Sequence, residues 1–190
     1  MRFAWWGQSL ELVDEPYNST ILNERAVEVA VARHWLTKVH GAGLEVGHVM
    51  SHYGLTRRRL IVDLHDPDPR CRNIDVLDIE GSFDWILAIS TIEHVHWDTT
   101  PRDPDASLRA IHHLQSCLTD KGRMLVTVPT GWQPHLDAAL AEAGAVRACT
   151  IARDGLGWQQ SPDITIEPYG ATTAWAESVW IGEYEGRTDA

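Results

Sequence analysis

The chain has 190 residues, of which 44% are hydrophobic and 23% are charged, and its formal net charge is -11. These proportions are typical of one globular domain and exclude a disordered chain. The negative charge argues against a nucleic-acid partner, because proteins that bind phosphate backbones present a basic surface. We interpret the short basic run at 57–59 as the solvated entry to a strand.

Cysteine spacing and hydropathy indicate the compartment. The three cysteines show no C-x-x-C spacing, which favours reduced thiols in a cytoplasmic protein over a disulfide framework. No stretch reaches the ~18 apolar residues that a membrane span needs, so we expect no membrane partner.

The first half of the chain combines one helix pattern with short apolar runs. Residues 22–36 carry apolar side chains at helical spacing, and Asn23 is available as an N-cap. The runs at 44–46, 60–63 and 73–79 predict strands, and a short helix is expected after the first of them.

The second half continues the alternation of strands and helices. The predicted elements are a strand at 85–89, a helix at 103–118, a strand at 122–129, a helix at 135–144 and strands at 146–154 and 177–184. Several strands are continuous apolar runs, so both of their faces must be covered. The pattern predicts an α/β fold, a Rossmann-like and mainly parallel sheet with helices on both faces.

We expect one domain made of four parts. These are an amino-terminal segment and helix at 1–39, a cofactor-binding core at 40–153, a substrate-side insertion at 154–176 and the last strand at 177–184.

Polar residues follow the predicted strands at their carboxyl ends, where open α/β sheets bind ligands. They are Glu45 and Gly47, then Asp63, then Asp78, then the segment from Ser90 to His94, and finally the segment from Thr130 to His135. Five such coincidences predict a single crevice. Glycine at 47 permits a backbone conformation that is closed to other residues and allows a ligand to come close.

Glu45 lies between Leu44 and Val46 in an apolar run, where a lone carboxylate is costly unless a positive charge meets it. Two partners are open at this point. One is an internal arginine, with Arg25 as the candidate, and the other is a cationic ligand.

Five segments between residues 40 and 130 follow one another in a characteristic order: GLEVGHVMSHYG, IVDLHD, NIDVLDI, FDWILAISTIEHV and LTDKGRMLVTVP. This order resembles the class I S-adenosylmethionine-dependent methyltransferases. The resemblance implies a seven-stranded sheet whose last strand is antiparallel. Val49 stands where the family's E-x-G-x-G motif has its second glycine.

The resemblance also implies S-adenosylmethionine as the cofactor, and its net positive charge would compensate Glu45. The implied contacts are Glu45 and Gly47 with the methionine part, Asp63 with the ribose hydroxyls, Asp78 with the adenine amino group, and Ser90 and Thr91 with the sulfonium end. His48, like His52 and His65, lies in a predicted loop near this cofactor.

An alcohol that accepts a methyl group must lose a proton, and histidine is a common general base. His135 is our first candidate and His94 the second, because both follow strands that overhang the donor methyl group in this fold. Glu93, Asp98 and Asp137 form a candidate set for Mg²⁺, which binds through a few carboxylates and waters.

Nine tryptophans suit a sugar acceptor, because aromatic rings stack on the apolar faces of sugars. Together with the segments NERAVEV and ISTIEHVHWD, these tryptophans form a pattern that is similar to small bacterial methyltransferases of glycan assembly. One such group is the mycobacterial enzymes that methylate a sugar hydroxyl in methylmannose polysaccharide synthesis. We therefore expect O-methylation of a sugar or oligosaccharide by a homodimer. The alternatives are another small-molecule hydroxyl or amine as acceptor, and an inactive methyltransferase-like partner subunit.

Overall fold

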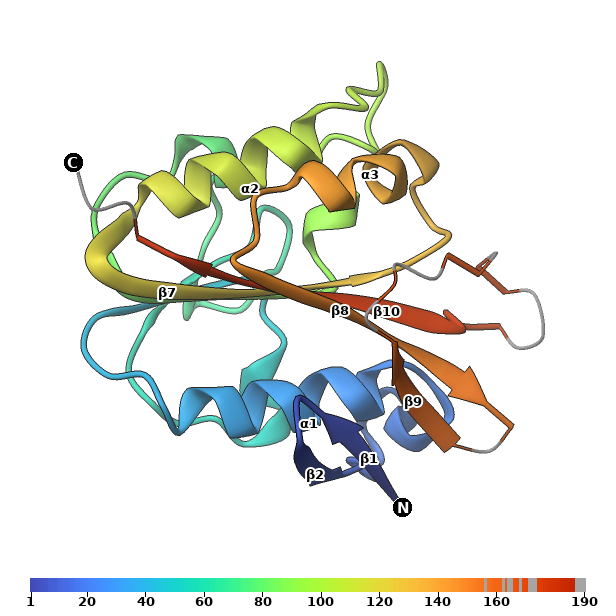
Figure 1. Cartoon of the computed structure of the whole chain (residues 1–190). Coiled ribbons are helices and arrows are strands. Elements are labelled where there is room, and N and C mark those ends of the chain that lie inside the picture. Colours follow the sequence, from blue (N-terminus) through green and yellow to red (C-terminus); the bar gives the residue numbers. More distant parts are fainter. Residues whose placement is uncertain (156, 162, 164–165, 168, 171–173, 187–190) are drawn as a thin grey trace.

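The computed structural model describes residues 1–155, 157–161, 163, 166–167, 169–170 and 174–186. A twisted central sheet separates two layers, with α2 and α3 on one face and α1 with a small hairpin on the other (Figure 1). Helices therefore cover both faces, as the sequence predicts.

The main sheet has eight described strands in the order β5-β4-β3-β6-β7-β10-β8-β9. Their bounds are Gly43–Val46 for β3, Leu60–Val62 for β4, Cys71–Arg72 for β5, Phe83–Ile89 for β6, Leu118–Pro129 for β7, Arg147–Asp154 for β8, Gly157–Ser161 for β9 and Ser178–Glu185 for β10. Strands β5, β4, β3, β6 and β7 pair in parallel, and β10 pairs antiparallel with both β7 and β8. The predicted mainly parallel sheet with an antiparallel last strand is confirmed.

The remaining elements are three α-helices, five short 3-10 segments and a hairpin among the described residues. They are α1 Arg25–Leu36, α2 Ala106–Ser116 and α3 Pro134–Ala139; η1 Tyr17–Leu22, η2 Met50–Tyr53, η3 Val76–Asp78, η4 Ile92–His94 and η5 Leu140–Glu142; and the strands β1 Arg2–Trp5 and β2 Gln8–Glu11. No described helix combines the length and apolar character that a membrane crossing requires.

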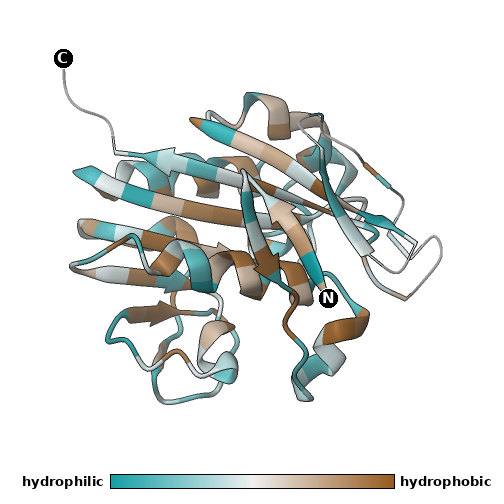
Figure 2. Ribbon diagram, turned by 60° about the horizontal axis from the view of Figure 1, so that its bottom comes forward, coloured by the Kyte–Doolittle hydropathy of each residue, from teal (hydrophilic) through white to brown (hydrophobic). Residues whose placement is uncertain are grey.

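The central strand β6 shows why the sheet needs two covers. Its alternate side chains Trp85, Leu87 and Ile89 pack into the core beside α1. Ile86 and Ala88 point to the opposite core beside α2. Figure 2 shows long hydrophobic stretches along the central strands. The side chains of these strands are buried in the two cores, one on each face of the sheet. The rigid sheet fixes the positions of the loops at its carboxyl edge.

Three expectations about elements are corrected by the structure. The third strand is limited to Cys71–Arg72, and the segment predicted at 73–79 turns into η3 because Asp75 caps it by accepting a hydrogen bond from Leu77 N. The helix predicted at 135–144 is split into α3 and η5. Strand β9, within the predicted insertion, adds an eighth strand at the sheet edge, and part of that insertion lies outside the described residues.

Candidate functional site

A cavity of about 340 Å³ opens at the carboxyl ends of β3, β4 and β6. Strand β3 is followed along the chain by β4 on one side, whereas β6 and β7 lie on the other, so this edge is where the strand order reverses. Its lining includes Gly47, His48, Asp63, Asp75, Ser90, Thr91 and His94. Five of these residues belong to the predicted crevice, His48 was predicted in a loop next to it, and the structure brings these six together.

Gly47 begins the turn after β3 and has a positive φ of 82°. A Cβ atom at this position would lie 2.1 Å from Thr91 Oγ1, which is far closer than van der Waals contact. The backbone conformation and the close approach of Thr91 therefore both require glycine. The close neighbour that the structure records is a side chain of the protein itself.

The charge of Glu45 is compensated by Arg59. The two side chains form an ion pair and are 1% and 4% exposed, and the other carboxylate oxygen accepts hydrogen bonds from Val49 N and Met50 N at 3.0 and 2.6 Å. Glu45 does not line the cavity. The expectation that Arg25 compensates Glu45 is thus wrong, and so is the interpretation of Arg59 as solvated. Because Arg59 already compensates the charge, Glu45 does not need a cationic ligand, and its contact with the methionine part of the cofactor stays a prediction.

Asp63 follows β4 and lines the cavity. Its Oδ1 accepts hydrogen bonds from His65 N and Asp66 N, at 3.0 and 2.9 Å, and its Oδ2 accepts one from His48 N at 3.3 Å. These bonds hold the carboxylate at the cavity wall. Oδ2, which accepts one hydrogen bond, keeps further acceptor capacity, so a contact with ribose hydroxyls stays a prediction for Asp63.

His48 is buried in the wall next to Asp63. Its Nδ1 lies 3.0 Å from Asp66 Oδ2, and its Nε2 has no hydrogen-bond partner in the described part of the chain. The His48 ring therefore forms part of the cavity wall, and its Nε2 makes no hydrogen bond to the described residues.

The acid that follows the third strand is Asp75, because β5 ends earlier than predicted. Asp75 lines the cavity, whereas Asp78 is exposed on η3 and does not. His96 Nε2 lies 2.5 Å from Asp75 Oδ2. Although partial burial acts to raise it, the pKa of Asp75 is lowered, because His96 and Leu77 N–H bond to the carboxylate. The assignment of Asp78 to this cavity is thus corrected to Asp75.

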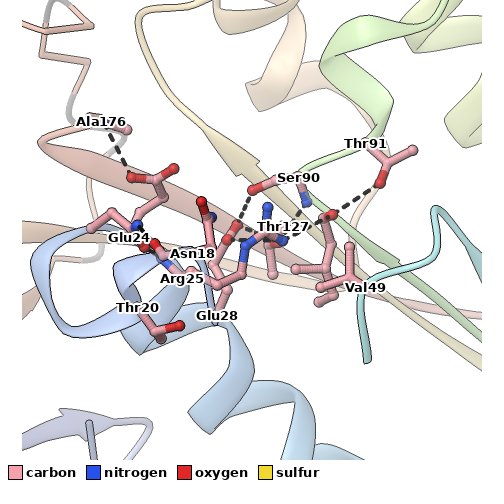
Figure 3. Close-up of polar contacts among 12 residues, drawn as sticks. Asn18, Thr20, Glu24, Arg25, Glu28, Val49, Ser90, Thr91, Thr127 and Ala176 are labelled. Atoms are coloured by element: carbon pink, nitrogen blue, oxygen red, sulfur yellow. Dashed lines mark hydrogen bonds and ion pairs between the residues drawn. The ribbon is translucent and has the colours of Figure 1, made fainter. Parts of the chain in front are cut away.

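Ser90 ends β6 in the left-handed region, with a φ of 41°, which is unusual for a residue other than glycine. Its hydroxyl donates to Glu28 Oε1 at 2.6 Å, and its N–H donates to Thr127 O at 3.1 Å. Figure 3 shows these contacts between α1 and the end of the sheet. Backbone strain of this kind persists only where the surroundings hold it, and it is common at functional sites.

Buried acids gather behind Ser90, and sequence reasoning missed them as a group. Glu28 is 0% exposed and also accepts from Thr127 Oγ1 at 2.6 Å, while Glu24 accepts from Ala176 N at 3.2 Å (Figure 3). Burial, and then the charge of Glu28, raise the pKa of Glu24 to about 7. The signal in the sequence was the spacing of Glu24 and Glu28. Residues four apart at the start of a helix lie on the same face, so the two carboxyl groups could be expected close together.

The two candidate bases differ in position. His94 lines the cavity, is exposed, and has its Nδ1 2.6 Å from Asp98 Oδ2. His135 lies on the first turn of α3, where its Nε2 pairs with Asp105 Oδ1 at 2.8 Å, and it does not line the cavity. The structure therefore reverses the predicted ranking, and His94 becomes the first candidate.

The carboxylates proposed for Mg²⁺ do not form a shared cage. Asp98 pairs with His94, and Asp137 accepts a hydrogen bond from Gly131 N at 2.9 Å. Among the described residues, one set of three His, Cys, Asp or Glu ligand atoms lies within 4.8 Å, and it consists of His48, Asp66 and Cys71. The predicted set of Glu93, Asp98 and Asp137 is wrong.

Most of the tryptophans expected beside a sugar serve the core instead. Trp180 is 0% and Trp158 is 6% exposed. Trp132, after β7, is 38% exposed, and its ring lies 5.6 Å from the His94 ring and 5.1 Å from the Tyr169 ring. An aromatic wall beside the candidate base is thus made by Trp132 and Tyr169.

The chain is similar to solved methyltransferase structures. It matches the N-methyltransferase NodS from Bradyrhizobium japonicum WM9, in complex with S-adenosyl-L-homocysteine, with a TM-score of 0.59 and 12% identity over 92% of this chain and 90% of that one. It matches Burkholderia thailandensis 1,6-didemethyltoxoflavin-N1-methyltransferase with a TM-score of 0.50 and 15% identity over 97% of each chain. No family model and no curated protein sequence matches the chain. These likenesses show that the chain has the Rossmann-like fold of these two methyltransferase structures.

Proposed function

We propose that this chain is an S-adenosylmethionine-dependent methyltransferase that acts on a small molecule. One observation carries the proposal: the cavity at the reversal of strand order is lined by the Gly47 turn, Asp63 and Asp75, each at the end of a different parallel strand. In open α/β sheets this crevice is the usual ligand site.

The cavity suits the cofactor in size and chemistry. Its volume of about 340 Å³ lies within the range of small-molecule sites, roughly 300–1,000 Å³. Asp63 would hold the ribose hydroxyls, and Asp75 would accept from the adenine amino group, beside the apolar side chains of Ile74 and Val76. Ser90 and Thr91 would border the sulfonium end. When bound, S-adenosylmethionine supplies an electrophilic methyl group.

The acceptor belongs at the Ser90 end of the cavity, and we propose a sugar or similar hydroxylated molecule. His94 supports this choice because it lines the cavity and its pairing with the Asp98 carboxylate orients the ring. A histidine held in this way accepts a proton from a hydroxyl group. The exposed ring of Trp132, next to His94, offers a stacking surface for a sugar.

Calorimetry with S-adenosylhomocysteine tests the cofactor part of the proposal. We expect one-site binding by the wild-type protein and at least about tenfold weaker binding by Asp63→Asn, because charge-assisted hydrogen bonds contribute ~1.5–3 kcal/mol. Asp120→Asn, an exposed aspartate on β7, is the matched control. If the wild-type protein does not bind the probe, the proposal fails and the inactive partner subunit becomes the better account.

A screen for methyl incorporation tests the acceptor. Purified protein with labelled S-adenosylmethionine is offered sugars, phenols and amines. Labelling of sugars alone supports the hydroxyl proposal, whereas labelling confined to phenols or to simple amines would replace it with the corresponding alternative.

A further inference from the structure

Three glutamates from two separate segments meet next to Ser90. Glu24 and Glu28 come from the start of α1, and Glu93 comes from η4 after β6. All three are buried, at 7%, 0% and 0% exposure. Arg25 is the cation that reaches them, with its Nη1 3.5 Å from Glu28 Oε2. One positive charge therefore faces three carboxyl groups.

Glu93 is the member of this group that accepts no hydrogen bond. Neither of its carboxylate oxygens has a hydrogen-bond partner in the part of the chain that the structure describes. The His94 ring lies beside it, with Nε2 3.7 Å from Glu93 Oε1. Glu24 and Glu28, in contrast, accept hydrogen bonds from backbone or hydroxyl donors. A fully buried carboxyl group without a hydrogen-bond donor requires an explanation, because its desolvation is costly.

We infer that Glu93, supported by Glu24 and Glu28, forms a subsite that binds a protonated amine of the acceptor. The acceptor class is then an amino sugar or another hydroxylated primary amine. The inference rests on the proposed function, because it takes the Ser90 end of the cavity as the place of the acceptor. Ser90 and His94 join the two regions, because both line the cavity, the Ser90 hydroxyl donates to Glu28, and His94 Nε2 lies 3.7 Å from Glu93 Oε1. Glu93 itself lies directly behind this lining.

The chemistry favours an ammonium group over other occupants. An ammonium group offers three N–H donors and one positive charge, which matches unpaired carboxylate oxygens in an acidic surrounding. A neutral hydroxyl brings no charge. Within the described residues these glutamates do not form a set whose ligand atoms lie within 4.8 Å, as a shared metal ion would need. The neighbouring aromatic rings of Trp132 and Tyr169 suit the same cation.

The electrostatics of the three glutamates agree with this assignment. Burial, reinforced by the charge of Glu28, holds the pKa of Glu93 well above its usual range. Burial also raises the pKa of Tyr169, and the charges of all three glutamates raise it further, so their field extends to the aromatic wall. A bound cation reverses such shifts, because a nearby opposite charge favours the ionised carboxylate.

Binding of matched probes to the S-adenosylhomocysteine-saturated protein tests the inference. The first set is glucosamine with glucose and N-acetylglucosamine as neutral partners, and the second is 2-phenylethylamine with 2-phenylethanol. Calorimetry or Trp132-sensitive fluorescence at pH 7 gives the affinities. We expect each amine to bind at least about 10-fold more tightly than its neutral partners, and Glu93→Gln to remove that preference, as expected for a buried charge pair. Glu11→Gln, an exposed glutamate on β2, is the matched control and keeps the preference.

The outcomes separate this inference from the proposed function. Unchanged S-adenosylhomocysteine affinity in Glu93→Gln shows that the variant is folded and that the cofactor site is intact. If the wild-type protein binds S-adenosylhomocysteine but shows no preference for either amine, including no binding of any probe, the inference is overturned while the cofactor site stands. An amine preference that survives Glu93→Gln overturns it as well. If Glu93→Gln does not fold, the wild-type comparison of amine and neutral probes decides alone.

Discussion

Glu45 and Arg59 form an ion pair that is almost completely buried at the start of the candidate site. Glu45 sits in β3, and Arg59 immediately precedes β4. The guanidinium also donates to Ser51 Oγ at 2.8 Å and to Arg57 O at 2.9 Å. The pair therefore fixes the connection between the two strands whose ends carry Gly47 and Asp63.

Glu45→Ala is expected to destabilise the fold as well as the site. Removing one partner of a buried ion pair leaves an uncompensated charge, here on Arg59, at a cost of about 3–5 kcal/mol. Urea denaturation should show this loss as a lower midpoint. Combining Glu45→Met with Arg59→Met should recover part of the stability, because apolar residues of similar size can replace such a pair, although Val49 N and Met50 N lose their acceptor. An unchanged midpoint in Glu45→Ala would contradict a structural role for the pair.

Gly47→Ala is expected to weaken S-adenosylhomocysteine binding by more than about tenfold and to destabilise the protein. The new Cβ would force Thr91 away from the turn, and such overpacking costs about 1–3 kcal/mol. Gly54→Ala is a close control, because Gly54 has a similar positive φ of 77° but open space around its missing Cβ. Calorimetry and thermal unfolding of both variants separate backbone strain from the clash. Equal effects in the two variants would mean that the Thr91 contact is unimportant.

Asp75→Asn should lower S-adenosylhomocysteine affinity by about tenfold or more, whereas Asp78→Asn should leave it unchanged. An adenine amino group donates more strongly to a carboxylate than to an amide oxygen. Asparagine is also a good N-cap, so it can still accept from Leu77 N and preserve η3. Calorimetry on the two variants checks the difference. A loss in Asp78→Asn alone would restore the original assignment.

The order of strands and helices was predictable because apolar runs repeat at characteristic spacing. The sheet core follows from runs such as 85–89, where every side chain needs cover. Loop residues were harder to predict. Asp75 was missed because the third strand has two residues, so the predicted strand ran past the acid that ends it. A strand this short carries almost no periodic signal.

Contacts between side chains that are distant in sequence also could not be predicted. Arg25 was the arginine named as a candidate partner for Glu45, yet Arg59 meets Glu45 because β3 and β4 are adjacent and parallel. Periodicity predicts which face a residue occupies and not which side chain it meets. The meeting of Glu24 and Glu28 with Glu93 has the same origin, because it depends on how α1 packs against the loop after β6.

His94→Gln is expected to lower kcat by about 10²–10⁴-fold with an acceptor found in the screen and to remove the acidic limb of the pH–rate profile. His94 is favoured because it lines the cavity and is oriented by Asp98. His135→Gln is the control, since its ring pairs with Asp105 outside the cavity. Steady-state rates from pH 5 to 9 provide the test. A full acidic limb in His94→Gln, or its loss in His135→Gln, would reject this assignment.

Glu24→Gln is expected to flatten the decline of stability between about pH 4.5 and pH 7. The pKa of Glu24 is raised from 4.5 to about 7 in the folded protein, chiefly by burial. Below pH 4.5 the carboxyl group is protonated in both the folded and unfolded states, so it has no effect. As the pH rises toward 7, the unfolded chain releases this proton first, and the free energy of unfolding falls.

The size of this effect follows from the same shift. Each unit of pKa difference corresponds to 1.36 kcal/mol, so Glu24 lowers stability by at most about 3 kcal/mol above pH 7. Glutamine keeps an oxygen that accepts from Ala176 N but cannot ionise, so the variant should be more stable than the wild-type protein at pH 8 and equal to it at pH 4. Urea denaturation across this range measures both curves, with Glu11→Gln as the control. Parallel curves for the wild-type protein and Glu24→Gln would mean that Glu24 ionises normally. A stabilised variant that also binds amine probes more weakly would instead show that the protein tolerates this buried acid for the sake of the acceptor site.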